Sequence, residues 1–185
     1  MARRWLGGVL GALVVLTGAV ARAQGAPDFD ADGYRSAHLR GPVTLAPTPA
    51  RRIGLAAALR LRGAVFVDVG AVESGARDPV RGDWLLTTPH LTIPGAVWVP
   101  DAGHAPPDAD VWRMMLATAR AHHGRRIVLF CHLDCWASWN AARRLARAGV
   151  PHVLWLAEGV EGWRDAGGAL APARPATRAQ QNAPG

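Results

Sequence analysis

Two cysteines, Cys131 and Cys135, are the residues whose type and spacing best suit chemistry, and the chain has no others. Because only three residues separate them, any bond between them would be local. A disulfide that closes so small a loop restrains little unfolded-chain entropy, so stability is a weak reason to form it. The pair therefore favours a working dithiol, in which one sulfur attacks and the other resolves a disulfide or a persulfide. The alternative is that both thiols are small buried hydrophobes or form one inert structural disulfide.

The flanking sequence predicts how the cysteines are positioned. Residues 127–130, IVLF, form a short apolar run that is typical of a strand buried on both faces of a parallel sheet. Ser138 is the predicted N-cap of a helix over residues 139–148. A cysteine between a strand end and a helix N-terminus gains a stabilised thiolate, so we expect Cys131 to be the attacking, more acidic and more exposed thiol. His132 would favour that thiolate when protonated, and Asp134 would oppose it.

Other segments predict the rest of an α/β domain with a mainly parallel sheet. Further strands are expected at residues 65–69, within residues 93–100 and at residues 153–156. Helices are expected at residues 51–61, from a cap at Asp110 to about residue 122, and at residues 159–167. Asp68 lies at a strand end, where a structural acceptor for loop amides is favoured over a site residue. Residues 70–94 are long and irregular, which indicates a functional or covering loop.

The chain divides into four predicted regions. Residues 1–23 contain Arg3 and Arg4, an apolar run and an A-x-A pattern, which predict a cleaved secretory signal peptide, a periplasmic location and no stable membrane span after cleavage. Residues 24–50 are predicted as an extended arm that packs on the domain, and residues 51–171 as the domain itself. Residues 172–185, rich in Ala, Pro and Gln, are predicted as a disordered tail.

Composition narrows the class of function. The net charge of +7 is mild, and three of the 21 basic side chains fall in the predicted signal segment, so nucleic-acid binding is not expected. A Cys-x-x-x-Cys pair alone is a weak metal signal, and we predict no metal site and no cofactor.

The order of segments resembles the rhodanese domain. Four stretches match its motifs: a strand ending in aspartate, a strand opening, a strand ending in the sulfur-carrying cysteine, and a closing leucine, glycine and tryptophan segment (residues 66–69, 93–96, 128–131 and 156–163). The resemblance covers about residues 51–170. It implies a three-layer α/β domain with Cys131 as the sulfur carrier.

A narrower resemblance comes from residues 131–136, CHLDCW, together with Tyr34-Arg35 and residues 38–42 of the arm. These stretches are similar to the PQQ-dependent catabolism-associated CXXCW motif protein family. That likeness implies an exported redox or persulfide-handling accessory to periplasmic alcohol oxidation by pyrroloquinoline quinone (PQQ) enzymes. The expected partners are a PQQ-dependent dehydrogenase, its cytochrome or a transport component. The site would comprise the catalytic cysteines, supporting Asp68, and a loop with His132, Leu133, Asp134, Trp136 and Ser138.

The loop departs from the rhodanese pattern in ways that bear on activity. A rhodanese loop usually supplies a glycine and an arginine that hold an anionic sulfur donor, and neither occurs in residues 132–136. Gly70 stands where the family's strand motif usually has arginine. Asp134 adds a carboxylate, whose repulsion of an anion about 4 Å away is worth about 1 to 4 kcal/mol. We therefore expect thiosulfate sulfurtransferase activity to be absent or feeble.

Two other functions are compatible with the same residues. Cys131 and Cys135 could hold Cu(I) with His132 or a remote histidine, because thiolates select soft ions. Alternatively, the domain is a non-catalytic module that binds a protein of the same system, with Trp136 and Trp139 as contact residues. A core location for these tryptophans would remove that basis.

Overall fold

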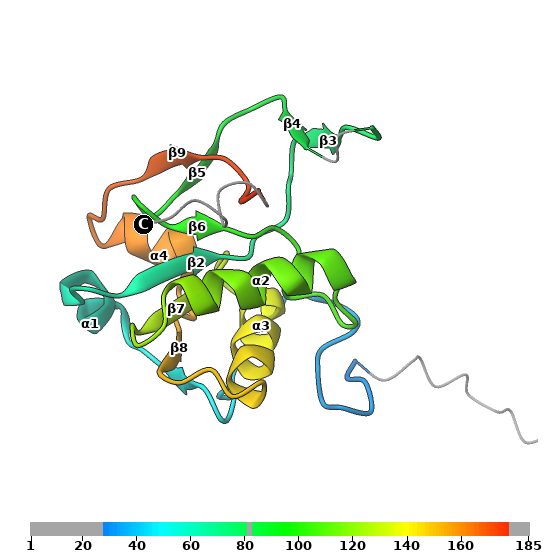
Figure 1. Ribbon diagram of the computed structural model, residues 1–185. Helices are drawn as coiled ribbons and strands as arrows, with labels where there is room; N and C mark the ends of the chain where they lie inside the picture. Colours follow the sequence, from blue (N-terminus) through cyan, green and yellow to red (C-terminus); the bar gives the residue numbers. More distant parts are fainter. Residues whose placement is uncertain (1–27, 81–82, 178–185) are drawn as a thin grey trace, which may run out of the picture.

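The computed structural model describes residues 28–80 and 83–177, and Figure 1 shows the arrangement of their secondary structure. The described part contains four helices and nine strands. In chain order these are β1 (Arg51–Arg52), α1 (Leu55–Arg60), β2 (Val65–Asp68), β3 (Gly75–Arg77), β4 (Trp84–Leu86), β5 (His90–Thr92), β6 (Val97–Trp98), α2 (Ala109–Ala121), β7 (Ile127–Phe130), α3 (Trp136–Arg147), β8 (Val153–Trp155), α4 (Gly159–Asp165) and β9 (Ala171–Ala173).

The central sheet has five strands, all parallel, in the order β1-β8-β7-β2-β6. Strand β7 is the middle strand, as the apolar run at residues 127–130 predicts, and every one of its residues is buried. Its register aligns Phe130 with Asp68 of β2. The carboxyl ends of β7 and β2 therefore lie side by side, and Cys131 follows directly from the centre of the sheet.

Successive side chains of the central strands point to opposite faces of the sheet, which creates two hydrophobic layers. Ile127 and Leu129 belong to the core on the side of α2 and α3, whereas Val128 and Phe130 belong to the core on the side of α1 and α4. Figure 1 shows these helices on the two faces of the sheet. The predicted three-layer α/β class is confirmed, and the continuous apolar run is explained by burial on both faces.

Two helices begin earlier than the sequence suggests. Helix α3 starts at Trp136, and its N-cap is Cys135 rather than Ser138. Helix α2 starts at Ala109, where the Asp108 side chain accepts hydrogen bonds from the N–H groups of Asp110 and Val111. The predicted caps were wrong because a Ser or Asp inside the first turn is chemically indistinguishable, in sequence, from one at the cap. The start at Trp136 shortens the cysteine loop.

The long segment after β2 is more regular than predicted. Strands β3 and β4 form an antiparallel hairpin that projects from the body of the domain (Figure 1). Gly75 is required there, because a Cβ at this position would lie 2.6 Å from the Leu85 carbonyl oxygen. Strand β5 then pairs with β9 at the other end of the chain.

Strand β9 also corrects the predicted disordered tail. Residues 171–173 pair with β5, Pro175 forms a bridge with Trp98, and Ala176 donates to the Trp98 carbonyl oxygen at 2.7 Å. Pro175 is buried. The composition of the segment misled the prediction because backbone pairing, rather than large apolar side chains, fixes these residues in place. Residues 178–185 lie outside the described residues.

The arm packs against the start of α3 through its aromatic residues. Tyr34 is buried, and the ring of Phe29 meets Trp136 and Trp139 edge to face, with centroid distances of 5.4 and 6.3 Å. The predicted signal segment, residues 1–23, lies outside the described residues. None of the helices in the described ranges is long and apolar enough to span a bilayer.

Candidate functional site: a buried dithiol at a helix N-terminus

The cysteine loop, residues 131–135, joins the carboxyl end of β7 to the amino end of α3. The first turn of α4 fixes its start, because the Val160 N–H donates to the Cys131 carbonyl oxygen at 2.8 Å. Gly159 has a φ of +61°, and a Cβ there would lie 2.5 Å from the same oxygen. Only glycine fits this contact. The closing segment of the rhodanese pattern therefore positions the cysteine loop.

Cys135 occupies the N-cap of α3, with extended backbone angles of φ −117° and ψ 113°. The first N–H groups of a helix have no partner within the helix and carry its positive dipole end. The backbone N–H groups of Ala137 and His132 both lower the pKa of the Cys135 thiol. The helix N-terminus thus acts on the second cysteine, whereas the sequence placed it at the first.

The two thiols are free and differ sharply in acidity. Burial raises the pKa of Cys131 well above its ordinary value of 9.0, and its interaction with Cys135 raises it further. A hydrogen bond from Cys131, the largest influence, lowers the pKa of Cys135 to about 6, although burial opposes the change. Cys131 is 1% exposed and Cys135 8%. The expectation that Cys131 is the more acidic and more exposed thiol was wrong, because the loop and α4 cover it.

Ser138 has a different role from the predicted cap. Its hydroxyl, buried in the first turn of α3, accepts hydrogen bonds from the Cys131 thiol and the Trp155 indole N–H, both at 3.1 Å. The same hydroxyl donates to the Cys135 carbonyl oxygen at 3.3 Å. The Ser138 contact lowers the pKa of Cys131, but burial outweighs it, so the neutral thiol stays beside Cys135.

His132 is directed toward carboxylates rather than toward the sulfurs. Its Nδ1 lies 2.6 Å from Glu161 of α4, and its Nε2 lies 3.4 Å from Glu73. The second Glu161 oxygen accepts the Leu133 N–H at 2.8 Å. These contacts clamp the loop backbone to α4. Leu133, by contrast, is 51% exposed at the surface of the loop.

Asp134 and Trp136 complete the predicted loop. Asp134 is exposed, has a φ of +52°, and offers its carbonyl oxygen to the Gly41 N–H of the arm at 2.8 Å. Asp is among the residues that tolerate this left-handed conformation, so it suits the turn. Trp136 is 4% exposed and Trp139 3%. Both tryptophans are core residues, which contradicts their use as surface contacts for a partner.

Asp68 is a structural acceptor, as the sequence favoured. It is buried at the carboxyl end of β2, where one oxygen accepts the Gly70 N–H at 2.8 Å. The other oxygen accepts the Thr92 hydroxyl at 2.6 Å and contacts His90 Nε2 at 2.8 Å. The His90 ring stacks on Trp98 with centroids 3.7 Å apart. Three donors satisfy this carboxylate and tie β5 to the sheet.

Three charged residues near the dithiol were missed by sequence reasoning. Arg40 of the arm lowers the pKa of Cys135 by its charge and contacts Glu73 at 3.6 Å. Glu73 lies in the segment predicted as irregular, and Glu161 lies in the closing motif. Only the long segment's predicted covering role gave any sign of Glu73, because contacts between distant segments leave no local pattern.

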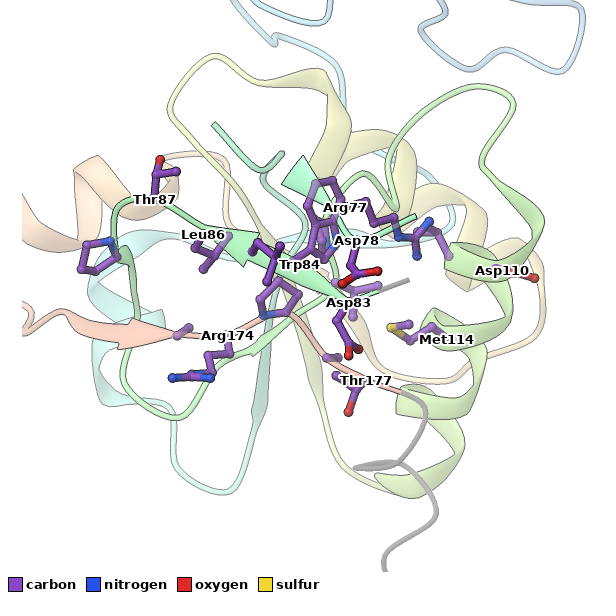
Figure 2. A pocket seen from close by; sticks show the side chains of 18 of the residues that line it. Arg77, Asp78, Asp83, Trp84, Leu86, Thr87, Asp110, Met114, Arg174 and Thr177 are labelled. Atoms are coloured by element: carbon purple, nitrogen blue, oxygen red, sulfur yellow. The ribbon is translucent and has the colours of Figure 1, made fainter. Parts of the chain in front are cut away.

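A cavity lies away from the cysteines. It measures about 1540 Å³ and is lined by the β3–β4 hairpin, the start of α2 and the segment around β9. Figure 2 shows Asp78, Asp83, Trp84 and Met114 among its lining residues. No residue of the cysteine loop lines it. The cavity and the dithiol are therefore separate features of the domain.

Among the described residues, no further metal ligands gather around the cysteine pair. Among residues 28–80 and 83–177, no group of three or more His, Cys, Asp or Glu side chains converges as a metal site would require. His132, the third ligand in the Cu(I) hypothesis, is engaged by Glu161. The described donors near the sulfurs are thus arranged for hydrogen bonding.

Comparison with known proteins finds a domain family whose model matches part of the chain. Residues 80–166 match the model of the rhodanese-like domain. No curated protein is significantly similar to the chain.

Solved structures with a similar fold include the following three. The BH2092 protein of Bacillus halodurans is 21% identical with a TM-score of 0.44, over 66% of this chain and 77% of that one. A Pseudomonas aeruginosa thiosulfate sulfurtransferase is 19% identical with a TM-score of 0.47, over 72% of this chain and 23% of that one. A Rhodopseudomonas palustris protein of unknown function, described as a possible tyrosine phosphatase, is 18% identical with a TM-score of 0.41, over 71% of this chain and 98% of that one.

The matched residues include β7, the cysteine loop, α3 and the closing segment that holds the loop. They belong to an α/β fold with a five-stranded, all-parallel central sheet and a cysteine at the end of the middle strand. Residues 80–166 therefore match the rhodanese-like domain, and the chain has a rhodanese-like α/β fold.

Proposed function

We propose that this protein is a thiol-disulfide or persulfide-handling protein that uses Cys135 and Cys131 as one dithiol. The observation that carries the proposal is the division of acidity between two adjacent free thiols. Cys135, at the helix N-terminus, has a pKa of about 6, whereas burial keeps Cys131 protonated beside it. A thiolate next to a thiol that can resolve it is the arrangement that thiol exchange requires.

The exchange proceeds in two steps. The Cys135 thiolate attacks one sulfur of a partner disulfide, forms a mixed disulfide and releases the other partner sulfur as a thiolate. Cys131 then loses its proton, attacks the Cys135 sulfur and releases the second partner sulfur as a thiolate. The protein dithiol is oxidised by two electrons and the partner disulfide is reduced by the same two electrons. This order of attack reverses the order predicted from the sequence.

A persulfide donor fits the same two thiols. The Cys135 thiolate attacks the outer, sulfane sulfur of a donor persulfide, which leaves a persulfide on Cys135 and releases the donor thiolate. Attack by Cys131 on the inner sulfur then forms the Cys131–Cys135 disulfide and releases hydrosulfide. Both routes end in the same local disulfide, so one redox measurement addresses both.

The cellular setting is also a proposal. The likeness of residues 131–136 and of the arm to the CXXCW motif family supports export to the periplasm and a role beside PQQ-dependent alcohol oxidation. The charged signal-like segment at residues 1–23 supports export in the same way. A dehydrogenase, its cytochrome or a transport component would then be the redox partner.

Thiol counting on protein purified from the periplasm tests the proposal. Alkylation and mass spectrometry before and after reductant should reveal two thiols that convert reversibly to one disulfide. Titration in defined dithiol buffers should give a potential above about −300 mV, the range of inert structural bridges lying below it. Two thiols that resist oxidation, or a potential below that limit, would exclude a working dithiol.

A further inference from the structure

The arm pairs with the cysteine loop as a short antiparallel strand. The Trp136 N–H donates to the Leu39 carbonyl oxygen and the Gly41 N–H donates to the Asp134 carbonyl oxygen, each at 2.8 Å. These two bonds flank Arg40 and Cys135, which form an antiparallel bridge. A segment nearly 100 residues away in sequence is thus bonded to the loop on both sides of Cys135.

The pattern of the two bonds fixes where the side chains lie. Because the bonds come from the neighbours of Arg40 and Cys135, these two residues form a non-hydrogen-bonded pair, whose Cα atoms are closest in an antiparallel ladder, at about 4.5 Å. Directly opposed residues of this kind place their side chains on the same face. The guanidinium stem of Arg40 therefore starts next to the Cys135 sulfur.

We propose that Arg40 is a positioning residue of the dithiol, supplied by the arm, whose charge stabilises the Cys135 thiolate and replaces the arginine that the loop lacks. This inference rests on the proposed function, because it concerns the same thiolate. It also gives the arm a role: residues 39–41 complete the site rather than only cover the core. The Arg40 side chain is 60% exposed, so its effect is screened by water and salt.

Other charged side chains around the loop also influence the Cys135 thiolate. Glu73 contacts both Arg40 and His132, at 3.6 and 3.4 Å, and competes with the thiolate for the guanidinium. Other charged or titratable side chains on the elements around the loop include Cys131, Asp134, Glu161 and Arg35, together with His38 of the arm and Arg143, Arg144 and Arg147 farther along α3. Arg35 stacks on the Trp136 ring and pairs with Asp28, so Arg40 is the arginine bonded opposite Cys135.

The experiment compares Arg40→Gln, Arg40→Lys and Glu73→Gln in the full, reduced protein. The pH profile of Cys135 alkylation by iodoacetamide, followed by mass spectrometry, reports the thiolate. Arg62→Gln is the control, because it removes the same charge from an exposed arginine between α1 and the amino end of β2. Arg40→Gln should move the inflection upward by about 0.3 to 0.7 of a pH unit, which corresponds to an exposed ion pair. Arg40→Lys should restore most of the shift.

Glu73→Gln separates an electrostatic role from a structural one. If Arg40 acts on the thiolate, freeing it from Glu73 should move the inflection downward, opposite to Arg40→Gln. Shifts in the same direction, or an Arg40→Gln profile equal to that of Arg62→Gln, would overturn the role of Arg40. The shift should also shrink in high salt, which a loss of folding would not produce. A wild-type profile without an inflection near pH 6 would instead refute the proposed function.

Discussion

The Asp68 carboxylate and the two cysteines lie side by side at the carboxyl edge of the central sheet, and they differ in how strongly they are hydrogen-bonded. Asp68, at the end of β2, has the Gly70 N–H, the Thr92 hydroxyl and His90 as partners within 2.8 Å. The cysteine loop follows β7, the neighbouring strand, and its thiols are weaker hydrogen-bonding groups: Cys131 lies 3.1 Å from the Ser138 hydroxyl and 3.6 Å from the Cys135 carbonyl oxygen.

The comparison shows that position at a strand end does not by itself make a reactive group. Three strong donors fix the Asp68 carboxylate, so its geometry holds β5 and Trp98 against the sheet. The thiols are close enough for each to change the pKa of the other, and a helix N-terminus favours charge on only one of them. The proposed reactivity rests on this unequal environment.

Exchanging the cysteines one at a time should have the largest effect. Cys135→Ser and Cys131→Ser each abolish the intramolecular disulfide, but they leave different thiols. Cys135→Ser leaves the buried thiol with the raised pKa, which should alkylate at pH 7 about tenfold or more slowly than the thiol left in Cys131→Ser. Wild-type protein should show an inflection near pH 6 that Cys135→Ser lacks.

Rates measured by mass spectrometry on folded protein check this prediction. The same variants unfolded in denaturant are the control, because the two thiols should then react at similar rates. Equal rates in the folded variants, or faster reaction of Cys135→Ser, would return the attacking role to Cys131.

Thiosulfate should be a poor substrate. The loop lacks the arginine and glycine of the rhodanese pattern, and Glu73 and Glu161 place carboxylates around His132. A dianion would therefore meet net negative charge at the mouth of the loop. A thiosulfate:cyanide sulfurtransferase assay should give turnover at the level of Cys131→Ser. Robust turnover that this variant loses would make Cys131 the sulfur carrier and refute the dithiol assignment.

The sequence was sufficient for the fold and the location of the dithiol, because both depend on local patterns. The apolar run at residues 127–130 and the cysteine spacing were enough to place Cys131 after the central strand. The acidity of the thiols could not be predicted in the same way. It depends on burial by α4, on where α3 begins and on Arg40. These features arise from tertiary contacts between segments that are far apart in the sequence. The predicted start of the helix was about one turn too late, so the prediction assigned the effect of the helix dipole to Cys131 instead of Cys135.

Removing the Asp68 carboxylate should cost stability and leave thiol chemistry unchanged. Asp68→Ala orphans up to three buried donors, each worth about 1 to 3 kcal/mol, so we expect a loss of about 3 kcal/mol in the free energy of unfolding. Denaturant unfolding measures this, with exposed Asp32→Ala as a control expected to stay within about 0.5 kcal/mol. The Cys135 alkylation profile should match wild type. A shifted profile would show that the two features are coupled.

The smallest effect should come from Glu161→Gln, which removes a carboxylate from the loop without touching a sulfur. Partial burial alone would raise the pKa of Glu161, but hydrogen bonds from His132 and the Leu133 N–H outweigh it and hold the pKa below its ordinary value of 4.5. Because the folded pKa is depressed, the stabilisation is complete above pH 4.5 and is lost as the pH falls through the folded value. At pH 7 the variant should therefore be about 1 kcal/mol less stable, and below pH 4.5 the difference should shrink. Denaturant midpoints across this range measure it, and a gap that persists in acid would point to lost packing rather than lost charge. The Cys135 inflection should not move, since Glu161 holds the loop backbone through Leu133 and is not among the groups that shift the pKa of Cys135.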